Sequence, residues 1–296
     1  MRIEDVMDRA ADELLISNVV VRNYYKERQG RAVGKKLKFG LWSDLHLEHS
    51  NWRPPEELPE WDFLLLGGDL SAIEGHLQEW LVRYCPAIPT YVVAGNHEYE
   101  DQDMGAYIER MKEFCRQEVP WVSYLERDVV EGPGGVRIAG ATLWTDFEIN
   151  GTLSASLAWA SGLPDFTRST RDFERRRLTP KGSLKVHRKT REWLEELIAS
   201  EDSRPEVVLT HFAPVPEAVE ACFAEKDNSY WVSDLSHLAS KVPFWGHGHT
   251  HRAYEAVDRK SGTKVACNAR GYSELSVLSG VAGFDPCRTW TVEVCR

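Results

Sequence analysis

The stretch YVVAGNHE at residues 91–98 joins a short apolar run to a glycine followed by amide, imidazole and carboxylate side chains. The apolar part, residues 91–94, is brief and rich in β-branched and aromatic residues, which predicts a buried strand. Polar side chains that directly follow such a strand lie at its carboxyl end, where open α/β sheets gather their ligands. Imidazole nitrogen, carboxylate and amide oxygen also bind divalent transition metals. The stretch therefore predicts a strand that ends at a metal site.

The same arrangement recurs at other places along the chain. Further apolar runs, which also predict buried strands, span residues 37–42, 63–66, 207–209 and 243–245. The polar motifs that follow them are, in order, Asp44-Leu45-His46, Gly68-Asp69, His211 in Leu-Thr-His-Phe, and a Gly-His-x-His near His249. One such motif carries little information, but five in series, each after an apolar run, predict one site at the edge of a sheet.

Taken together, the motifs resemble the signature of the calcineurin-like metallophosphoesterase family, which reads D-x-H, G-D, G-N-H-E, H and G-H-x-H. The resemblance runs from about Leu37 to the C-terminus. Residues 143–147, 210–214 and 267–272 also resemble the flanking text of a bacterial subgroup of single-domain phosphoesterases. The resemblance implies an α/β fold, a four-layer sandwich of two mixed β-sheets flanked by helices, with metals at one sheet edge.

The resemblance also implies a role for each motif residue. Asp69 matches the carboxylate that bridges two metal ions. Asp44 and His46 match the ligands of the first ion, together with the last histidine of Gly-His-x-His. Asn96 and His211 match the ligands of the second ion, together with the first histidine of that motif. His97 is not a ligand in the family, and we expect it to act as general acid or transition-state donor at the leaving oxygen, with Glu98 orienting the loop.

Residues 246–251 contain Gly-His-x-His in two overlapping frames. We prefer the frame 248–251, because threonine at the variable position is the family's commonest form and residues 244–246 remain free to finish the strand. This frame makes His249 and His251 metal ligands and leaves His247 beside them or facing the substrate. Arg252 and Arg270 lie close in sequence to the motifs, and each is a candidate phosphate contact or a member of a buried ion pair.

The predicted ligand set suits hydrolysis of an anionic phosphoester. Two metal ions about 3.5–4 Å apart clamp the phosphoryl oxygens and lower the pKa of a bridging water. Asp44 and Asp69 are the only anionic ligands against the four positive charges of two divalent ions, so the site keeps a positive charge that attracts the substrate. Its histidine content favours manganese, iron, zinc or nickel over magnesium or calcium.

The expected function is therefore that of a dinuclear-metal-dependent hydrolase, which uses metal-activated hydroxide to cleave a small phosphorylated metabolite or nucleotide. A nuclease or cyclic-nucleotide phosphodiesterase could use the same site, so the sequence leaves phosphatase and phosphodiesterase activity open. A non-catalytic metal-binding scaffold is disfavoured, because such versions typically lose the catalytic histidine or several ligands.

Composition limits the class of protein and its partners. The 296 residues have 42% hydrophobic content and 11 Trp, enough for a sizeable core. A net charge of −10 argues against general attraction to nucleic acid or anionic membrane. Apolar runs fall short of the roughly 20 residues that a membrane span needs. The 6 Cys form no C-x-x-C pair, and the N-terminus has no basic-then-apolar signal pattern, so we expect a cytoplasmic protein with reduced thiols. The sequence does not indicate the oligomeric state.

Three regions surround the motifs. Residues 1–36 predict an amphipathic helix and a basic linker. We prefer a helix that docks on its own domain or a frayed tail over a helix that binds a partner or dimerises. Residues 37–296 form the metallophosphoesterase domain, with an inserted loop region at 151–182. Residues 168–191 hold ten Lys or Arg against only Asp172 and Glu174. They form either a solvated helix face or an electropositive rim for substrate, with 175–177 as its strongest candidates.

Periodicity predicts the remaining elements. Apolar residues at helical spacing predict helices at 73–84, 104–115 and about 183–199. Residues 136–143, 253–257, 264–267 and 289–294 predict antiparallel strands of a second sheet. Four histidines lie in polar or helical contexts and are expected to be solvated: His49, His76, His187 and His237.

Overall fold

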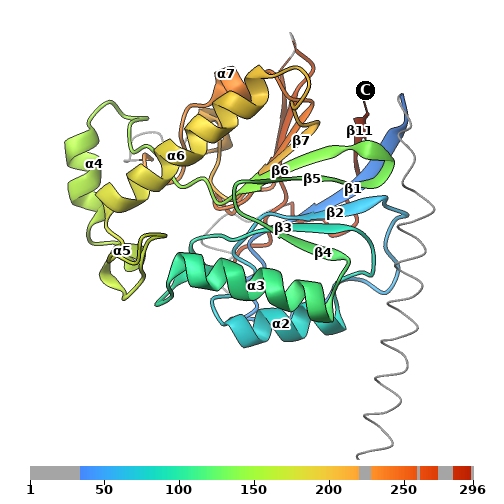
Figure 1. Ribbon diagram of the computed structural model, residues 1–296, viewed down its shortest axis with the longest axis horizontal. Coiled ribbons are helices and arrows are strands. Elements are labelled where there is room, and N and C mark those ends of the chain that lie inside the picture. Colours follow the sequence, from blue (N-terminus) through green and yellow to red (C-terminus); the bar gives the residue numbers. More distant parts are fainter. Residues whose placement is uncertain (1–33, 220–227, 259–260, 273–282, 295–296) are drawn as a thin grey trace, which may run out of the picture.

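A computed structural model describes residues 34–219, 228–258, 261–272 and 283–294. The helix and most of the linker predicted at residues 1–36 lie outside these ranges. The described chain forms four layers, in which two helices, a five-stranded sheet, a six-stranded sheet and a further helix layer follow one another (Figure 1). The predicted four-layer sandwich of two mixed sheets is confirmed.

The first sheet has the strand order β11-β1-β2-β3-β4. Its strands are β1 Lys36–Trp42, β2 Phe63–Leu66, β3 Thr90–Val93, β4 Val122–Leu125 and β11 Trp290–Glu293. Because β1, β2, β3 and β4 are mutually parallel, their carboxyl ends lie at one edge. The prediction that residues 289–294 form a strand of the second sheet is wrong, because this strand, β11, belongs to the first sheet. It pairs antiparallel with β1, because Trp290 and Val292 continue the apolar face that β1 presents to the other sheet.

The second sheet has the order β5-β6-β7-β8-β10-β9. Its strands are β5 Asp128–Glu131, β6 Arg137–Ala141, β7 Val207–Thr210, β8 Phe244–His247, β9 Tyr254–Val257 and β10 Lys264–Cys267. The prediction that the strands near 136–143 and 264–267 are antiparallel holds for only one neighbour of each. β6 is parallel to β7 and β10 is parallel to β8, whereas the edge strands β5 and β9 are antiparallel. Short hairpins produce the antiparallel pairs, and the long connection through a helix produces the β6–β7 pair.

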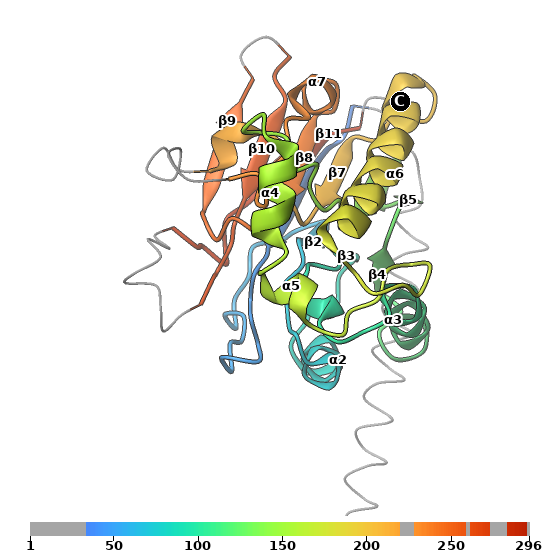
Figure 2. The same cartoon turned by 90° about the vertical axis from the view of Figure 1, so that its left-hand side faces the viewer.

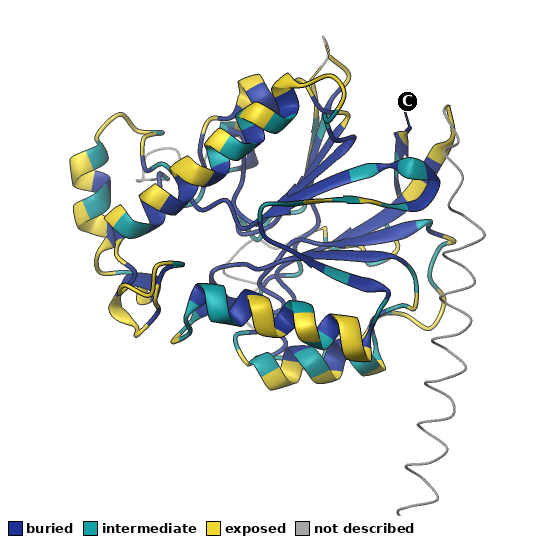
Figure 3. Ribbon diagram, in the orientation of Figure 1, coloured by how far each residue is buried: buried dark blue, intermediate teal, exposed yellow. Residues whose placement is uncertain are grey.

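The core between the sheets is built from alternate residues of the strands, as the period of two in a strand requires. On β1, Leu37, Phe39 and Leu41 face this core, and the ring of Phe39 stacks on Phe63 with centroids 4.7 Å apart. Alternate residues of β2 and β3, Leu64 and Val92, instead belong to the core cluster that includes the helical residues Leu77 and Met111. Figure 3 shows the result, with the central strands of both sheets buried and the outer helix faces exposed. This packing fixes the two sheets against each other and aligns their carboxyl ends.

Helices α2, Glu74–Arg83, and α3, Met104–Glu118, cover the first sheet, and α6, Pro180–Ala199, lies on the second (Figure 1). The predicted inner face of α3 is buried, and Asp103 caps that helix by accepting from the Ala106 N–H. α6 begins three residues before its predicted start, because Thr179 caps it and Pro180 occupies its first turn.

One of the four histidines expected to be solvated is buried. His187 lies on the inner face of α6, with Nδ1 3.3 Å from the carbonyl oxygen of Trp144. Its spacing from Leu194 and Ile198 puts it on the apolar stripe of the helix, so the helical period overrides its polar character. His49, His76 and His237 are exposed, as predicted.

The inserted region is not all loop. Residues 151–182 contain α4, Leu153–Ala160, and α5, Pro164–Thr167, and lead into α6. Both short helices lie beyond the ends of the strands, at the left of Figure 1 and towards the viewer in Figure 2. Shorter elements are α7 Ser236–Ala239 and the 3₁₀ helices η1 His97–Tyr99, η2 Pro133–Gly135 and η3 Pro216–Ala218. The insertion is therefore placed to form a wall next to any site at the strand ends.

Within the described ranges, no helix has both the length and the apolar character needed to cross a membrane. The described cysteines, Cys85, Cys115, Cys267 and Cys287, are free thiols.

Candidate metal centre

The backbone at the strand ends is unusual at five predicted ligands. Left-handed φ angles of 45–67° occur at Asp44, His46, Asp69, His249 and His251. Such angles are uncommon outside glycine and cost conformational energy, and they cluster at functional sites. Backbone hydrogen bonds hold the turns together, including Asp44 N–H to the Gly68 carbonyl at 2.9 Å and His46 N–H to the Asp69 carbonyl at 3.1 Å. The motif loops therefore form one bonded unit.

Glu98 ties two of these loops together from beneath. Its buried carboxylate accepts from the backbone N–H groups of Asp69 at 3.0 Å, Leu70 at 2.6 Å and Gly95 at 2.7 Å. Burial, with a contribution from the Asp69 carboxylate, raises the pKa of Glu98 to about 7. The contacts agree with a role in orienting the loop.

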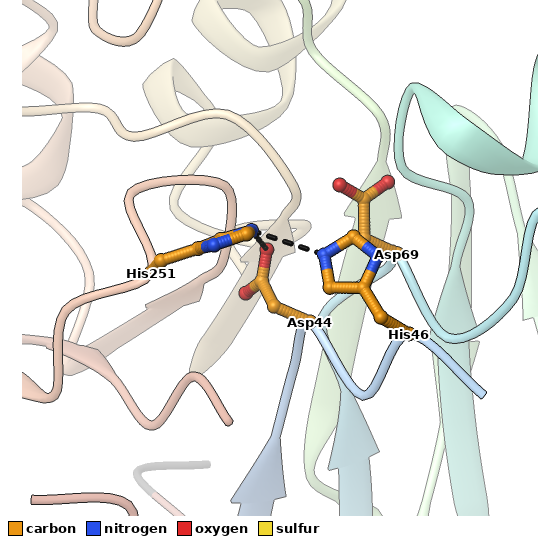
Figure 4. Close-up of side chains that lie close together, drawn as sticks. All are labelled: Asp44, His46, Asp69 and His251. Atoms are coloured by element: carbon orange, nitrogen blue, oxygen red, sulfur yellow. Dashed lines mark hydrogen bonds and ion pairs between the residues drawn. The ribbon is translucent and has the colours of Figure 1, made fainter. Parts of the chain in front are cut away.

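A first group of potential metal ligands consists of Asp44, His46, Asp69 and His251, whose ligand atoms all lie within 4.8 Å of one another. Figure 4 shows His251 directed at Asp44 and His46, with Asp69 beside them. His251 Nε2 lies 3.0 Å from His46 Nε2 and 3.4 Å from Asp44 Oδ1. Two imidazole nitrogens and a carboxylate oxygen thus converge on one point, as the ligands of a divalent ion would.

A second group consists of Asp69, His211 and His249. His211 Nε2 lies 3.2 Å from Asp69 Oδ2 and 3.1 Å from Asn96 Oδ1, so the Asn96 amide belongs to the same cluster. Nδ1 of His211 is 2.8 Å from the Gly67 carbonyl, which directs Nε2 into the cluster. Asp69 is common to both groups. Although its burial opposes ionisation, His211 and His97 hold the pKa of Asp69 well below its usual value.

Three features of the two ligand groups suit bound metal ions. Among the described residues, none forms a hydrogen bond with the buried Nε2 of His249. A buried ring nitrogen without a partner is costly, and a metal ion would satisfy it. The backbone is also shaped for close approach, because a Cβ at Gly248 would lie 2.8 Å from Asp44 Oδ2. The donors present, imidazole, carboxylate and amide, suit divalent transition metals.

His97 lies on η1, beside both groups. Its Nε2 is 3.1 Å from the hydroxyl of Tyr272 and 4.0 Å from Asp69 Oδ2, and its Nδ1 is 3.3 Å from Glu100 Oε1. Burial lowers the pKa of His97, but the carboxylates of Asp69 and Glu100 outweigh burial and raise it above its usual value. The ring is thus held between a carboxylate on one nitrogen and the cluster on the other.

Two residues next to the cluster were not predicted to belong to it. Glu48 lies 3.1 Å from His46 Nδ1 and, with His46 and His97, forms a third group of possible ligands. Tyr272 stacks its ring on that of His46 with centroids 4.1 Å apart. Tyr272 is the last residue of the flanking stretch 267–272, which was the available signal for it, whereas Glu48 had none.

Of the three predicted substrate-binding residues, His247, Arg252 and Arg270, only Arg252 lines the cavity over the cluster. A cavity of about 970 Å³ opens over the cluster and is lined by Asp69, Asn96, His97, His249 and His251, and also by Arg252. His247 and Arg270 do not line it. His247 is buried in β8 and belongs to neither ligand group. Arg270 donates to the Leu45 carbonyl at 3.0 Å and the Ser50 hydroxyl at 2.8 Å, so it braces a motif loop.

A histidine-rich cluster with a shared carboxylate, at the aligned ends of two packed sheets, defines a candidate metal-dependent hydrolase. The family model of the calcineurin-like phosphoesterases matches residues 37–253, so the chain belongs to that family and is a phosphoesterase. This confirms the family resemblance and the prediction of an enzyme.

The fold is similar to that of the phosphopantetheinyl hydrolase from Mycobacterium tuberculosis. The two share 17% sequence identity with a TM-score of 0.60, over 87% of this chain and 97% of that one. A second solved structure aligns over 79% of this chain and 91% of its own, at 13% identity and a TM-score of 0.45. Among curated proteins, none matches the sequence.

Proposed function

We propose that the protein is a dinuclear metal-dependent hydrolase that cleaves a small phosphorylated metabolite or nucleotide. The observation that supports this most directly is that Asp69 belongs to both ligand groups. In the proposal, the Asp69 carboxylate would be a ligand of both ions. Asp44, His46 and His251 would hold the first ion, and Asn96, His211 and His249 would hold the second.

Two bound divalent ions, of manganese, iron, zinc or nickel, would stabilise charge on the phosphoryl group and lower the pKa of a bound water. The residues of the chain then have separate tasks. His97 faces the cavity through Nε2 and donates a proton to the leaving oxygen, a contribution of about 10²–10⁴ in rate. The Glu100 carboxylate, 3.3 Å from Nδ1 of His97, attracts the ring and keeps it in this orientation. Tyr272 limits the movement of the ring from the other side.

The charges near the cavity support a small substrate over a long nucleic acid. Arg175 and Arg176 are paired with Asp103 at 3.7 Å and Asp172 at 3.0 Å, and the Arg177 guanidinium donates to a carbonyl. These arginines do not line the cavity. Long nucleic acids are bound through many phosphate contacts along a basic surface. In this chain, the basic residues 175–177 instead interact mainly with nearby carboxylates and a carbonyl. This supports the alternative in which they form a solvated helix face.

The test compares hydrolysis by metal-depleted protein before and after reloading with each candidate metal. The panel contains phosphomonoesters, a linear diester, a cyclic nucleotide, single-stranded DNA, and 4′-phosphopantetheine, which is included because the structural neighbour is a phosphopantetheinyl hydrolase. We expect metal-dependent turnover of small esters. Faster cleavage of the DNA would replace the proposal with the nuclease alternative, and turnover that survives metal removal would overturn it.

A matched pair of histidine variants controls for nonspecific damage. His211→Ala removes a predicted ligand from the buried cluster and should abolish metal-dependent turnover. His237→Ala changes an exposed histidine on α7 that lies outside both ligand groups, and should retain wild-type turnover. Equal activity in the two variants would contradict the assignment of the cluster.

A further inference from the structure

The cavity over the cluster has two chemically different sides. One side carries the polar groups of the candidate metal centre. The other carries apolar and aromatic side chains from the inserted region and the segments before and after residues 220–227: Trp159, Leu163, Pro164, Val219, Tyr230 and Trp231. We call these six residues the aromatic wall. A phosphoester bound at the metal centre would extend its organic part toward this wall.

Aromatic contacts connect the wall to the metal centre without a break. The ring of Tyr230 lies 5.2 Å from that of His249, a predicted ligand. Tyr230 and Trp231 have centroids 5.4 Å apart, and Trp231 and Trp159 have centroids 5.7 Å apart. These separations lie in the range of favourable ring pairs. The wall therefore starts at the place where the phosphoryl group would bind and leads away from it.

Trp159 is exposed although it is a large aromatic residue. Its exposed fraction is 46%, and among the described residues few large hydrophobic side chains are as exposed. The others, Ile73, Val129 and Val257, do not line the cavity. An exposed indole inside a concave site is typical of a surface that covers an apolar group of a ligand.

Charge along the cavity disfavours a second phosphate on the organic part. Among the described residues, the arginines that line it are Arg168 and Arg252. Arg168 is paired with Glu100 at 3.2 Å and Asp101 at 3.6 Å, and Arg252 donates to the Glu217 carbonyl at 3.1 Å. Glu100 and Asp165 add negative charge to the same lining. The remote part of the cavity is thus suited to an apolar group with little charge.

Building on the proposed function, we infer that the aromatic wall binds the organic part of the substrate and that the substrate class is a phosphoester with an aromatic or apolar group. The volume of about 970 Å³ is at the upper end of the range for small-molecule sites, so the cavity accommodates a group larger than a single ring. Trp159 and Trp231 would contact that group, whereas the metal centre would hold the phosphate. In this arrangement the inserted region determines specificity.

The experiment compares 2-naphthyl phosphate with phenyl phosphate, whose leaving groups have similar acidity, in the metal-loaded protein. We expect kcat/KM to favour the naphthyl ester by about threefold to tenfold, the range expected from an added ring contact. Trp159→Ala and Trp231→Ala should each reduce this ratio toward unity, and Trp159→Phe should restore part of it. Ile73→Ala removes an equally exposed apolar side chain that does not line the cavity, and should keep the wild-type ratio.

A binding measurement separates this inference from the proposed function. Calorimetry with 2-naphthylmethylphosphonate and methylphosphonate should show tighter binding of the naphthyl compound, and Trp159→Ala should remove the difference. If neither ester is hydrolysed, the proposed function fails and the binding ratio alone decides the inference. If both esters are hydrolysed but the ratio is unity, or is the same in the tryptophan variants, the inference is overturned and the proposed function stands.

Discussion

The candidate metal centre and the aromatic wall face the same cavity, but they are built in opposite ways. The donors of the centre follow strands and are buried, with Asp44, Asp69 and His211 at most 1% exposed. The wall comes largely from short helices and connections, and its Trp159 is 46% exposed. Metal ligands need fixed positions, which parallel strands provide at their ends. A surface that selects the organic part of a substrate can instead reside on segments that vary without disturbing the sheets.

The largest effect expected at the metal centre is that of Asp69→Asn. The change removes the one anionic ligand common to both groups, so the protein should lose most of its metal and at least about 100-fold in activity. Metal analysis and kcat/KM test this prediction. Asp234→Asn, which changes an exposed carboxylate that accepts from the Ser236 N–H, should keep both. Retention of two metals per chain and near-normal turnover by Asp69→Asn would show that Asp69 is not the bridge.

His97→Ala should separate catalysis from metal binding. His97 lies beside both groups and is not predicted to be a ligand, so metal content should persist while kcat falls by about 10²–10⁴. The loss should be smaller for esters with good leaving groups, which need less protonation. An unchanged kcat for an ester with a poor leaving group would remove His97 from the mechanism.

The overlapping Gly-His-x-His frames give a matched pair of variants. His251 lies with Asp44 and His46, whereas His247 is buried outside both groups. His251→Ala should therefore lose metal, roughly 10- to 100-fold in affinity. His247→Ala should retain both ions, although it removes a buried ring. The opposite result would move the ligand frame to 246–249.

The smallest effect concerns charge at the rim of the cavity. Arg168→Gln should raise KM for anionic esters by about twofold to fivefold, because Arg168 lines the cavity but is partly solvated and paired. The effect should fade as salt rises, since charges are screened beyond about 8 Å at physiological ionic strength. Neutralising 175–177 together is the control, and it should leave KM nearly unchanged. A larger effect from the triple variant would restore the electropositive-rim alternative.

The sequence predicted the motif donors better than the side chains that contact them, for a physical reason. A donor that directly follows an apolar run lies at the carboxyl end of the strand which that run forms. The sequence therefore placed Asp44, Asp69, Asn96 and His211 together. Tyr272 reaches His97 from 175 residues away, and nothing local to either residue signals that contact.

The errors in the predicted fold also arise because local sequence does not specify long-range neighbours. Apolar alternation identified the last strand, Trp290–Glu293, but does not specify which sheet edge receives it. The strands β4 and β5 were not predicted, because Val122–Leu125 contains a serine and Asp128–Glu131 alternates in exposure at a sheet edge. Short edge strands have weak patterns, since water covers part of their surface.

The ligand groups also join two parts of the chain. Asp44, Asp69 and Asn96 follow strands of the first sheet, whereas His211, His249 and His251 follow strands of the second. Metal ions bound by ligands from both sheets would cross-link the sheets at one end of the sandwich. Binding to the folded state alone stabilises a protein by about 2.7 kcal/mol at a ligand concentration of 100 Kd. Removal of metal should therefore lower the melting temperature and open the cavity end of the sandwich to proteases before the opposite end.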